Sequence, residues 1–222
     1  MIAGVRLKVC GLTSLVDAEA ADRCGADYLG FILHPRSPRF LPLAQYLAMA
    51  SRLPDRRRVA VSVEPTAAEL SAMTRAGFDC FQIHFGSRID PARLEEWSGI
   101  AGRDRLWLAP KLPPEADVPA VVRASAQTVL MDTFHAAGFG GSGLTGDWAK
   151  FARHRVAFPG NFWFLAGGLN ETNIGDALAA SGARFVDVNS GVESSPGVKD
   201  ESKLRRFADA LRVAAGSGNP GA

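Results

Sequence analysis

Two side chains capable of acid–base chemistry end apolar, strand-like segments of the sequence. Cys10 closes the run VRLKVC (5–10), and Asp132 closes the run TVLMD (128–132). A thiol acts as a base when positive neighbours or dipoles favour the thiolate. A carboxyl group at the rim of an apolar layer has a raised pKa and can donate a proton near neutral pH. The structural alternatives are a buried cysteine and a carboxylate that caps a loop N–H group.

Two basic residues, Lys8 and Arg39, could lie near Cys10 in the folded chain. Lys8 lies two residues before Cys10, and the alternation of side chains along a strand points both toward one face. Arg39, in PRSPRF (35–40), can supply a positive field or bind a carboxylate bidentately, and the two prolines of this segment favour a stiff loop over a solvated one. A Schiff-base aldolase would need an inner-strand lysine such as Lys8, but we interpret Lys8 as a supporting charge.

The other two cysteines indicate no chemistry of their own. Cys10, Cys24 and Cys80 are widely spaced and form neither a CxxC pair nor a zinc-ligand pattern, which argues against a disulfide framework and a metal site. We therefore interpret Cys24 and Cys80 as small buried hydrophobic residues. This cysteine usage predicts a reducing, cytoplasmic location.

The composition of the 222 residues is that of a globular chain, with 47% hydrophobic and 22% charged residues. A formal net charge of +2 predicts no electrostatic footprint for nucleic acid. The sequence contains no apolar run of membrane-spanning length and no secretory signal pattern after Met1, so we expect neither a membrane association nor export.

Apolar segments alternate with helical ones along the chain, which is typical of parallel βα units. Asp90 (followed by Pro91), Asp147, Asn170 and Asp200 occupy positions typical of helix N-termini. The apolar runs are nearly continuous, as expected for strands covered on both faces. The eight candidate strands are 5–10, 28–33, 58–63, 80–84, 105–109, 128–132, 162–166 and 185–189.

Eight such units predict an α/β fold, a single (β/α)8 TIM barrel, with a doubly wound open sheet as the alternative. We find no domain boundary, because the proline-rich segment 109–119 is too short for a linker and fits a loop between the fifth strand and the fifth helix. The predicted domain covers residues 1–215, and residues 216–222 are expected to form a disordered tail.

Glycine-bearing loops follow the last two predicted strands. A barrel carries its chemistry at the carboxyl ends of its strands, and the loops after strands seven and eight often bind phosphate. Gly167 and Gly168 follow the seventh run, and Ser190 and Gly191 follow the eighth. The sequence therefore predicts a ligand that carries a phosphate group. The glycine-rich segment 133–145 after the sixth run predicts a mobile lid.

Several segments together resemble the phosphoribosylanthranilate isomerase family. They are KVCGLT (8–13), GADYLGFILHPRSPRF (25–40), the stretch 132–148, LAGGLN (165–170) and VDVNSGVESSPGVKD (186–200). The resemblance implies a (β/α)8 barrel of tryptophan biosynthesis. Such an enzyme opens the ribose ring of N-(5-phosphoribosyl)anthranilate and isomerises the aminoaldose to an aminoketose, 1-(2-carboxyphenylamino)-1-deoxyribulose 5-phosphate. It also implies a reaction without a metal or organic cofactor.

The resemblance also implies roles for single residues. Cys10 matches the family's general base, Asp132 its general acid, and Arg39 the arginine that meets the anthranilate carboxylate. Gly167, Gly168, Ser190 and Gly191 lie in the matching phosphate loops. We assign further substrate contacts to Lys8, His84 and Asp187. We expect a small phosphosugar as the partner, and a monomer or a homodimer.

The chain departs from the family pattern at Phe85 after the fourth strand, at Leu144 and Gly146 in the lid, and at Asn189 after the eighth strand. These departures bear on lid packing and substrate fit rather than on the class of reaction. Two rival functions stay open. One is the phosphoribosyl isomerase of histidine biosynthesis or a dual-substrate form, which resembles a doubled half-barrel with an aspartate in place of Cys10. The other is a phosphate-binding barrel without catalysis.

Overall fold

The computed structural model describes residues 1–132 and 147–217. Eight parallel strands pair in chain order, and β1 also pairs with β8, so that the sheet closes into a barrel. This closure confirms the predicted barrel and excludes the open sheet. Each predicted run overlaps one strand, with ends that agree within two residues. The strands are β1 (Arg6–Val9), β2 (Tyr28–Ile32), β3 (Arg57–Val63), β4 (Cys80–Gly86), β5 (Leu106–Lys111), β6 (Thr128–Met131), β7 (Phe162–Leu165) and β8 (Phe185–Val188).

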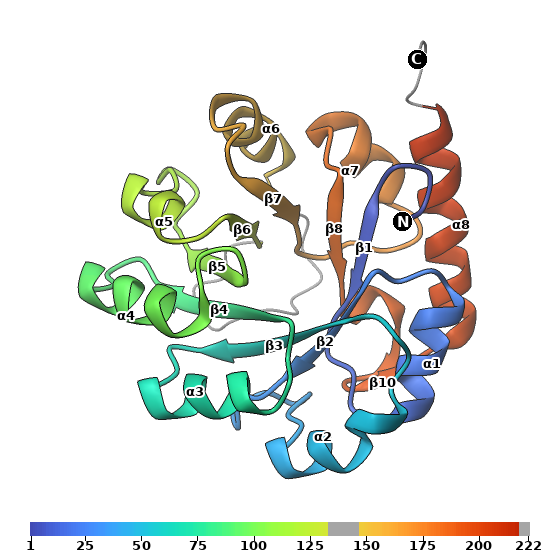
Figure 1. Cartoon of the computed structure of the whole chain (residues 1–222). Coiled ribbons are helices and arrows are strands. Elements are labelled where there is room, and N and C mark those ends of the chain that lie inside the picture. The colour runs from blue at the N-terminus through green and yellow to red at the C-terminus, as the bar shows by residue number, and fades with distance from the viewer. Residues whose placement is uncertain (133–146, 218–222) are drawn as a thin grey trace.

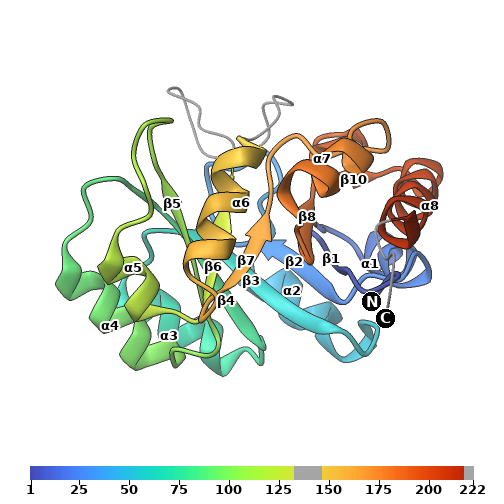
Figure 2. The same cartoon turned by 90° about the horizontal axis from the view of Figure 1, so that it is seen from above.

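Helices follow the strands and lie outside them, as Figures 1 and 2 show from two directions. Three of the four predicted caps are confirmed: the Asp90 side chain accepts from the N–H of Ala92, that of Asp147 from the N–H of Lys150, and that of Asp200 from the N–H of Lys203. The helices are α1 (Leu15–Arg23), α2 (Leu43–Met49), α3 (Ala67–Arg75), α4 (Pro91–Ala101), α5 (Ala120–Ser125), α6 (Trp148–Ala157), α7 (Ile174–Ser181) and α8 (Glu201–Ser217), with short 3₁₀ helices η1 (Ala50–Arg52) and η2 (Ser190–Val192).

Two boundaries differ from the predictions. Helix α7 begins at Ile174 with Asn173 as its N-cap, so the predicted cap at Asn170 was wrong. The Asn170 side chain instead accepts from the backbone N–H groups of Thr172 and Asn173, which closes a turn ahead of the helix. Helix α8 continues through Ser217, two residues into the predicted tail, and residues 218–222 lie outside the described part of the chain.

The apolar residues form two layers. The larger layer lies between the strands and the helices and includes the stacked rings of Tyr46 and Phe78, 3.9 Å apart. The smaller layer fills the inside of the barrel, where Tyr28, Trp107 and Phe164 pack against one another with ring centroids 4.4 to 5.7 Å apart. Because these rings plug the barrel, a ligand can enter only above them, at the strand ends.

A short antiparallel hairpin that the sequence did not predict follows β8. It consists of β9 (Glu193–Ser195) and β10 (Val198–Lys199). Thr13, in the loop after β1, donates a hydrogen bond from its Oγ1 to the carbonyl of Gly197 at the turn, 2.6 Å away. The hairpin is therefore tied to the loop that follows the first strand.

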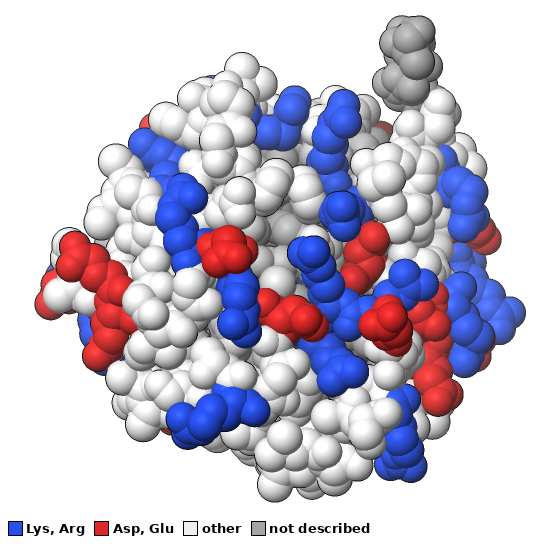
Figure 3. Space-filling view, in the orientation of Figure 1, with Lys and Arg blue, Asp and Glu red and all other residues white. Residues whose placement is uncertain are grey.

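Charges of both signs are interspersed on the face seen in Figure 3, in keeping with the small net charge. None of the helices in residues 1–132 and 147–217 is long and apolar enough to cross a membrane.

Candidate active site

One cavity of about 660 Å³ lies among the strand ends. Its volume is in the range of small-molecule sites. The residues assigned to catalysis or binding from the sequence line this cavity, except for Lys8 and Gly191. Those that line it are Cys10, Arg39, His84, Asp132, Gly167, Gly168, Asp187 and Ser190. Segments far apart in the chain thus converge on one space.

Lys8 and Asp187 form a buried ion pair beside the cavity. Strand register pairs Lys8 of β1 directly with Asp187 of β8, and the lysine Nζ donates to both carboxylate oxygens at 2.9 Å. Burial alone would lower the pKa of Lys8, but the carboxylate of Asp187 and the nearby Cys10 raise it above its ordinary value. Lys8 is therefore a fixed positive charge. Its side chain is fully buried and is not among the residues that line the cavity, so the substrate contact assigned to Lys8 remains a prediction.

Cys10 is buried and lies close enough to Lys8 for the lysine charge to act on its thiol. Gly30, on the neighbouring strand, makes room for both: a Cβ there would lie 3.0 Å from the Lys8 side chain and 3.1 Å from the Cys10 sulfur. Burial raises the pKa of the Cys10 thiol above its ordinary value, and the charges of Lys8 and Lys199 oppose the rise without cancelling it. The thiol is thus mainly protonated at neutral pH, and the two lysines favour its thiolate form.

Arg39 lines the cavity and is paired with Glu193 of the hairpin. Its Nε donates to the carboxylate at 2.8 and 3.1 Å and its Nη2 at 2.7 Å, so that one edge of the guanidinium is occupied. The Glu193 hydrogen bonds raise the pKa of Arg39. Gly11, at φ +72°, leaves space for this side chain, since a Cβ there would lie 2.8 Å from Arg39 Cδ and 2.6 Å from Asn189 Oδ1.

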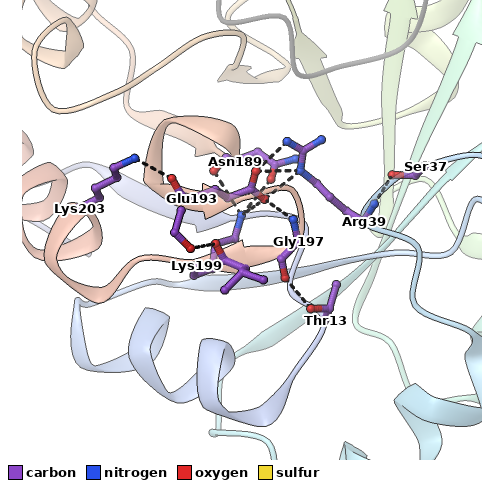
Figure 4. Close-up of polar contacts among 10 residues, drawn as sticks. Thr13, Ser37, Arg39, Asn189, Glu193, Gly197, Lys199 and Lys203 are labelled. Carbon is purple, nitrogen blue, oxygen red and sulfur yellow. Dashed lines mark hydrogen bonds and ion pairs between the residues drawn. The ribbon is translucent and has the colours of Figure 1, made fainter.

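Glu193 and Lys199 are buried charged residues bonded to the cavity-lining Arg39 and Asn189, and the sequence reasoning missed both. The Lys199 Nζ donates to Glu193 Oε1 at 2.9 Å, to Asn189 Oδ1 at 2.9 Å and to the Asn189 carbonyl at 3.2 Å (Figure 4). Both charges belong to the motif VDVNSGVESSPGVKD, and the only signal was two opposite charges that flank a Pro-Gly turn. Nothing in the sequence indicated that the turn folds both side chains inward.

The loops after β7 and β8 approach each other closely. The backbone N–H groups of Gly167 and Gly168 have no hydrogen-bond partner among the residues that the structure describes. Gly191 does not line the cavity; it packs against the loop after β7, where a Cβ would lie 2.0 Å from the Leu169 carbonyl oxygen. Ser190 lines the cavity beside the two glycines. Donors for an anion therefore face the cavity from the first loop, and Gly191 permits the second to lie against it.

His84 is a neutral side chain in the cavity wall. Burial and the charge of Lys8 lower its pKa to about 4. Its Nε2 lies 2.7 Å from the amide nitrogen of Gln82, which donates to it. Gln82 Oε1 and Ser62 Oγ, also in the cavity wall, are buried without a hydrogen-bond partner among the described residues. This wall therefore presents neutral polar groups rather than charges.

Asp132 lies at the cavity directly after β6, as predicted. The predicted lid, with the departures at Leu144 and Gly146, lies outside the described residues. Phe85 is buried in the outer layer, 5.9 Å from the ring of Trp97, and so it points away from the cavity. At Asn189, the last position at which the chain departs from the family pattern, the side-chain Oδ1 accepts a hydrogen bond from Lys199 Nζ.

The comparisons with known proteins agree on one family. The family model described as N-(5'phosphoribosyl)anthranilate (PRA) isomerase matches residues 7–210. A relative from Cereibacter sphaeroides named N-(5'-phosphoribosyl)anthranilate isomerase is 37% identical over 218 residues, which cover 95% of this chain and 100% of that protein.

Solved structures give the same result. The crystal structure of phosphoribosyl anthranilate isomerase from Thermus thermophilus aligns with a TM-score of 0.77 and 31% identity, covering 94% of this chain and 99% of that one. A phosphoribosyl anthranilate isomerase in complex with reduced 1-(O-carboxyphenylamino)-1-deoxyribulose 5-phosphate aligns with a TM-score of 0.75 and 27% identity, over 94% of this chain and 99% of that one. The chain therefore belongs to the N-(5'-phosphoribosyl)anthranilate isomerase family.

Proposed function

We propose that this chain isomerises N-(5-phosphoribosyl)anthranilate to 1-(2-carboxyphenylamino)-1-deoxyribulose 5-phosphate, a step of tryptophan biosynthesis. The observation that carries the proposal is the convergence of Cys10, Asp132 and Arg39 on one cavity with the glycine loop after β7. An acid–base reaction of a phosphosugar that carries both a phosphate and a carboxylate group requires a base, an acid and donors for the two anions. The cavity supplies them as a thiol, a carboxyl group, a cation and unpaired N–H groups. Family membership supports the same substrate.

The cavity suggests one orientation of the substrate. The phosphate group is bound by the N–H groups of Gly167 and Gly168 and by the Ser190 loop, because these two adjacent loops supply backbone donors that have no partner among the described residues. The anthranilate carboxylate is bound by Arg39, which lines the cavity and whose Nη1 has no hydrogen-bond partner among the described residues. The ribose then lies between them, over Cys10.

The reaction proceeds through proton transfers alone and leaves no net change in composition. Asp132 donates a proton to the ring oxygen as the C1′–O bond breaks, and the nitrogen lone pair forms a C1′=N bond. The Cys10 thiolate then removes the C2′ proton; the C2′–H electron pair forms C1′=C2′, and the C1′=N pair returns to nitrogen as an enolamine. Loss of the 2′-hydroxyl proton and protonation at C1′ give the ketone. Lys8 favours the thiolate throughout.

The raised pKa of Cys10 predicts a pH dependence. Since the base is the thiolate and the folded pKa lies above the ordinary thiol value, the thiolate fraction increases about tenfold per pH unit below that pKa. We expect the ultraviolet absorbance of the Cys10 thiolate, taken as the difference between the wild type and Cys10→Ser, to be still rising at pH 9. This titration reports the thiolate alone, whereas turnover also requires Asp132 to be protonated. A difference that has already reached its plateau at pH 7 would contradict the raised pKa of Cys10.

The proposed activity is tested by incubating the purified chain with N-(5-phosphoribosyl)anthranilate and following the loss of its fluorescence. We expect turnover without an added metal or cofactor. The same preparation incubated with the aminoimidazole carboxamide substrate of histidine biosynthesis separates the rival isomerase, for which we expect no conversion. Binding of the anthranilate substrate without any turnover would instead support a phosphate-binding barrel and contradict the proposal.

A further inference from the structure

Glu193 is the centre of a buried polar cluster at the edge of the cavity. Its carboxylate accepts hydrogen bonds from Nε and Nη2 of Arg39, from Nζ of Lys199 and from the backbone N–H of Gly197 (Figure 4). The Glu193 side chain is 4% exposed and the Arg39 side chain 10%. A carboxylate with this many donors is held in one orientation, and it holds its partners in turn.

The cluster leaves only part of Arg39 for a ligand. Glu193 occupies the Nε–Nη2 edge, and Nη1 has no hydrogen-bond partner among the described residues. A substrate carboxylate must therefore approach the end of the guanidinium, through Nη1 and the second hydrogen of Nη2. The bidentate contact expected from the sequence therefore remains a prediction, limited to this end of the guanidinium.

The charges of the cluster do not cancel. Arg39 and Lys199 are two cations against the single carboxylate of Glu193. Although burial raises the pKa of Glu193, its bonds to Arg39 and Lys199 bring the pKa below the ordinary value, so the carboxylate is ionised at neutral pH. One net positive charge is thus left at the cavity edge, where a ligand carboxylate can neutralise it.

Each neighbour of Glu193 belongs to a different part of the site. Arg39 comes from the loop after β2, and Lys199 holds Asn189, the residue before Ser190 in the loop after β8. The hairpin that carries Glu193 is fixed to the loop after β1 by the contact between Thr13 and Gly197. Glu193 thus connects Arg39 to rigid parts of the barrel rather than to solvent.

We infer that Glu193 is a positioning residue for carboxylate recognition: it fixes Arg39 so that the Nη1 end of the guanidinium meets the aryl carboxylate of the substrate. The inference deepens the proposed function and rests on it for the identity of the ligand. The Glu193 side chain acts mainly on one end of the substrate: it bonds Arg39 directly, whereas it makes no hydrogen bond to Gly167 or Gly168 and reaches the Ser190 loop only through Lys199.

The test compares the wild type with Glu193→Gln, which keeps the shape and removes the charge. Calorimetry with reduced 1-(O-carboxyphenylamino)-1-deoxyribulose 5-phosphate should give a Kd for Glu193→Gln that is higher than that of the wild type on the order of 10- to 100-fold. The reason is that a displaced Arg39 guanidinium no longer hydrogen-bonds the ligand carboxylate. Inhibition by inorganic phosphate, which probes the glycine loops alone, should be unchanged. In turnover, KM for N-(5-phosphoribosyl)anthranilate should rise while kcat changes little.

A double-mutant cycle with Arg39→Ala tests whether Glu193 acts on ligand binding through Arg39 or through the general stability of the site. Once Arg39 is absent, Glu193→Gln should raise the Kd of the carboxyphenyl ligand no further. The matched control is Glu201→Gln, the same change at an exposed carboxylate that pairs with Arg205 on α8, for which we expect wild-type binding.

Three results would overturn the inference: wild-type affinity of Glu193→Gln for the carboxyphenyl ligand, an equal loss of phosphate inhibition, or additive effects in the cycle. Each of them would leave the proposed function standing. Conversely, a wild type that binds the carboxyphenyl ligand but does not turn over the substrate would overturn the proposed function alone, since the binding comparison still tests Glu193.

Discussion

Cys10→Ser is expected to lower kcat by about 10²- to 10⁴-fold, the range over which a positioned base contributes to a rate. Serine preserves the size of the side chain, but its hydroxyl is a far weaker acid than the thiol and gives almost no anion even beside Lys8. Binding of the substrate should persist, because the phosphate loops and Arg39 are untouched. Steady-state kinetics by fluorescence loss measure both parameters.

Cys24→Ser is the matched control for this change. Cys24 is a buried free cysteine at the end of α1, away from the residues that line the cavity. We expect it to keep the wild-type kcat. If Cys10→Ser retained a kcat within a few fold of the wild type, while Cys24→Ser did the same, the thiol would have no part in proton removal.

Lys8→Met should have the largest effect on folding. It leaves the buried carboxylate of Asp187 without its partner, and breaking one side of a buried ion pair costs about 3–5 kcal/mol of the free energy of unfolding. That loss is a large fraction of the total stability of a domain. Urea denaturation followed by circular dichroism should show a much lower midpoint for Lys8→Met than for the wild type.

The double variant Lys8→Met with Asp187→Leu should recover most of the lost stability, because an apolar pair of similar volume often replaces a buried ion pair without penalty. Arg206→Met, which breaks the exposed pair with Glu171, is the control and should cost less than about 1 kcal/mol. A Lys8→Met midpoint equal to that of Arg206→Met would contradict the account of this pair.

Much of the fold could be predicted because its signals are local. Each strand is a short apolar run, and most helices begin with a side chain, such as Asp90 or Asp147, whose oxygen can accept a backbone N–H. The error at Asn170 arose because two asparagines lie near the start of α7 and both are typical of N-caps. In the folded loop Asn173 occupies the N-cap position, and the Asn170 side chain closes the turn before it.

The site could be predicted where a residue lies at the end of a strand or in the loop directly after it. Cys10, Asp132 and Asp187 end or nearly end their strands, and a barrel brings strand ends together. Lys8 was placed on the correct face, but register with β8 turns it toward Asp187 instead of the cavity. Glu193 could not be found in this way, because its burial depends on a hairpin tied to the loop after β1, a contact between residues far apart in sequence.

Removal of the C2′ hydrogen by Cys10 is the central claim, and the most direct measurement follows that hydrogen. With N-(5-phosphoribosyl)anthranilate labelled with deuterium at C2′, nuclear magnetic resonance reports the rate at which deuterium leaves C2′ for water. The account predicts rapid loss with the wild type and loss slowed with Cys10→Ser to the same extent as kcat. Loss of the label from Cys10→Ser at the wild-type rate would contradict it.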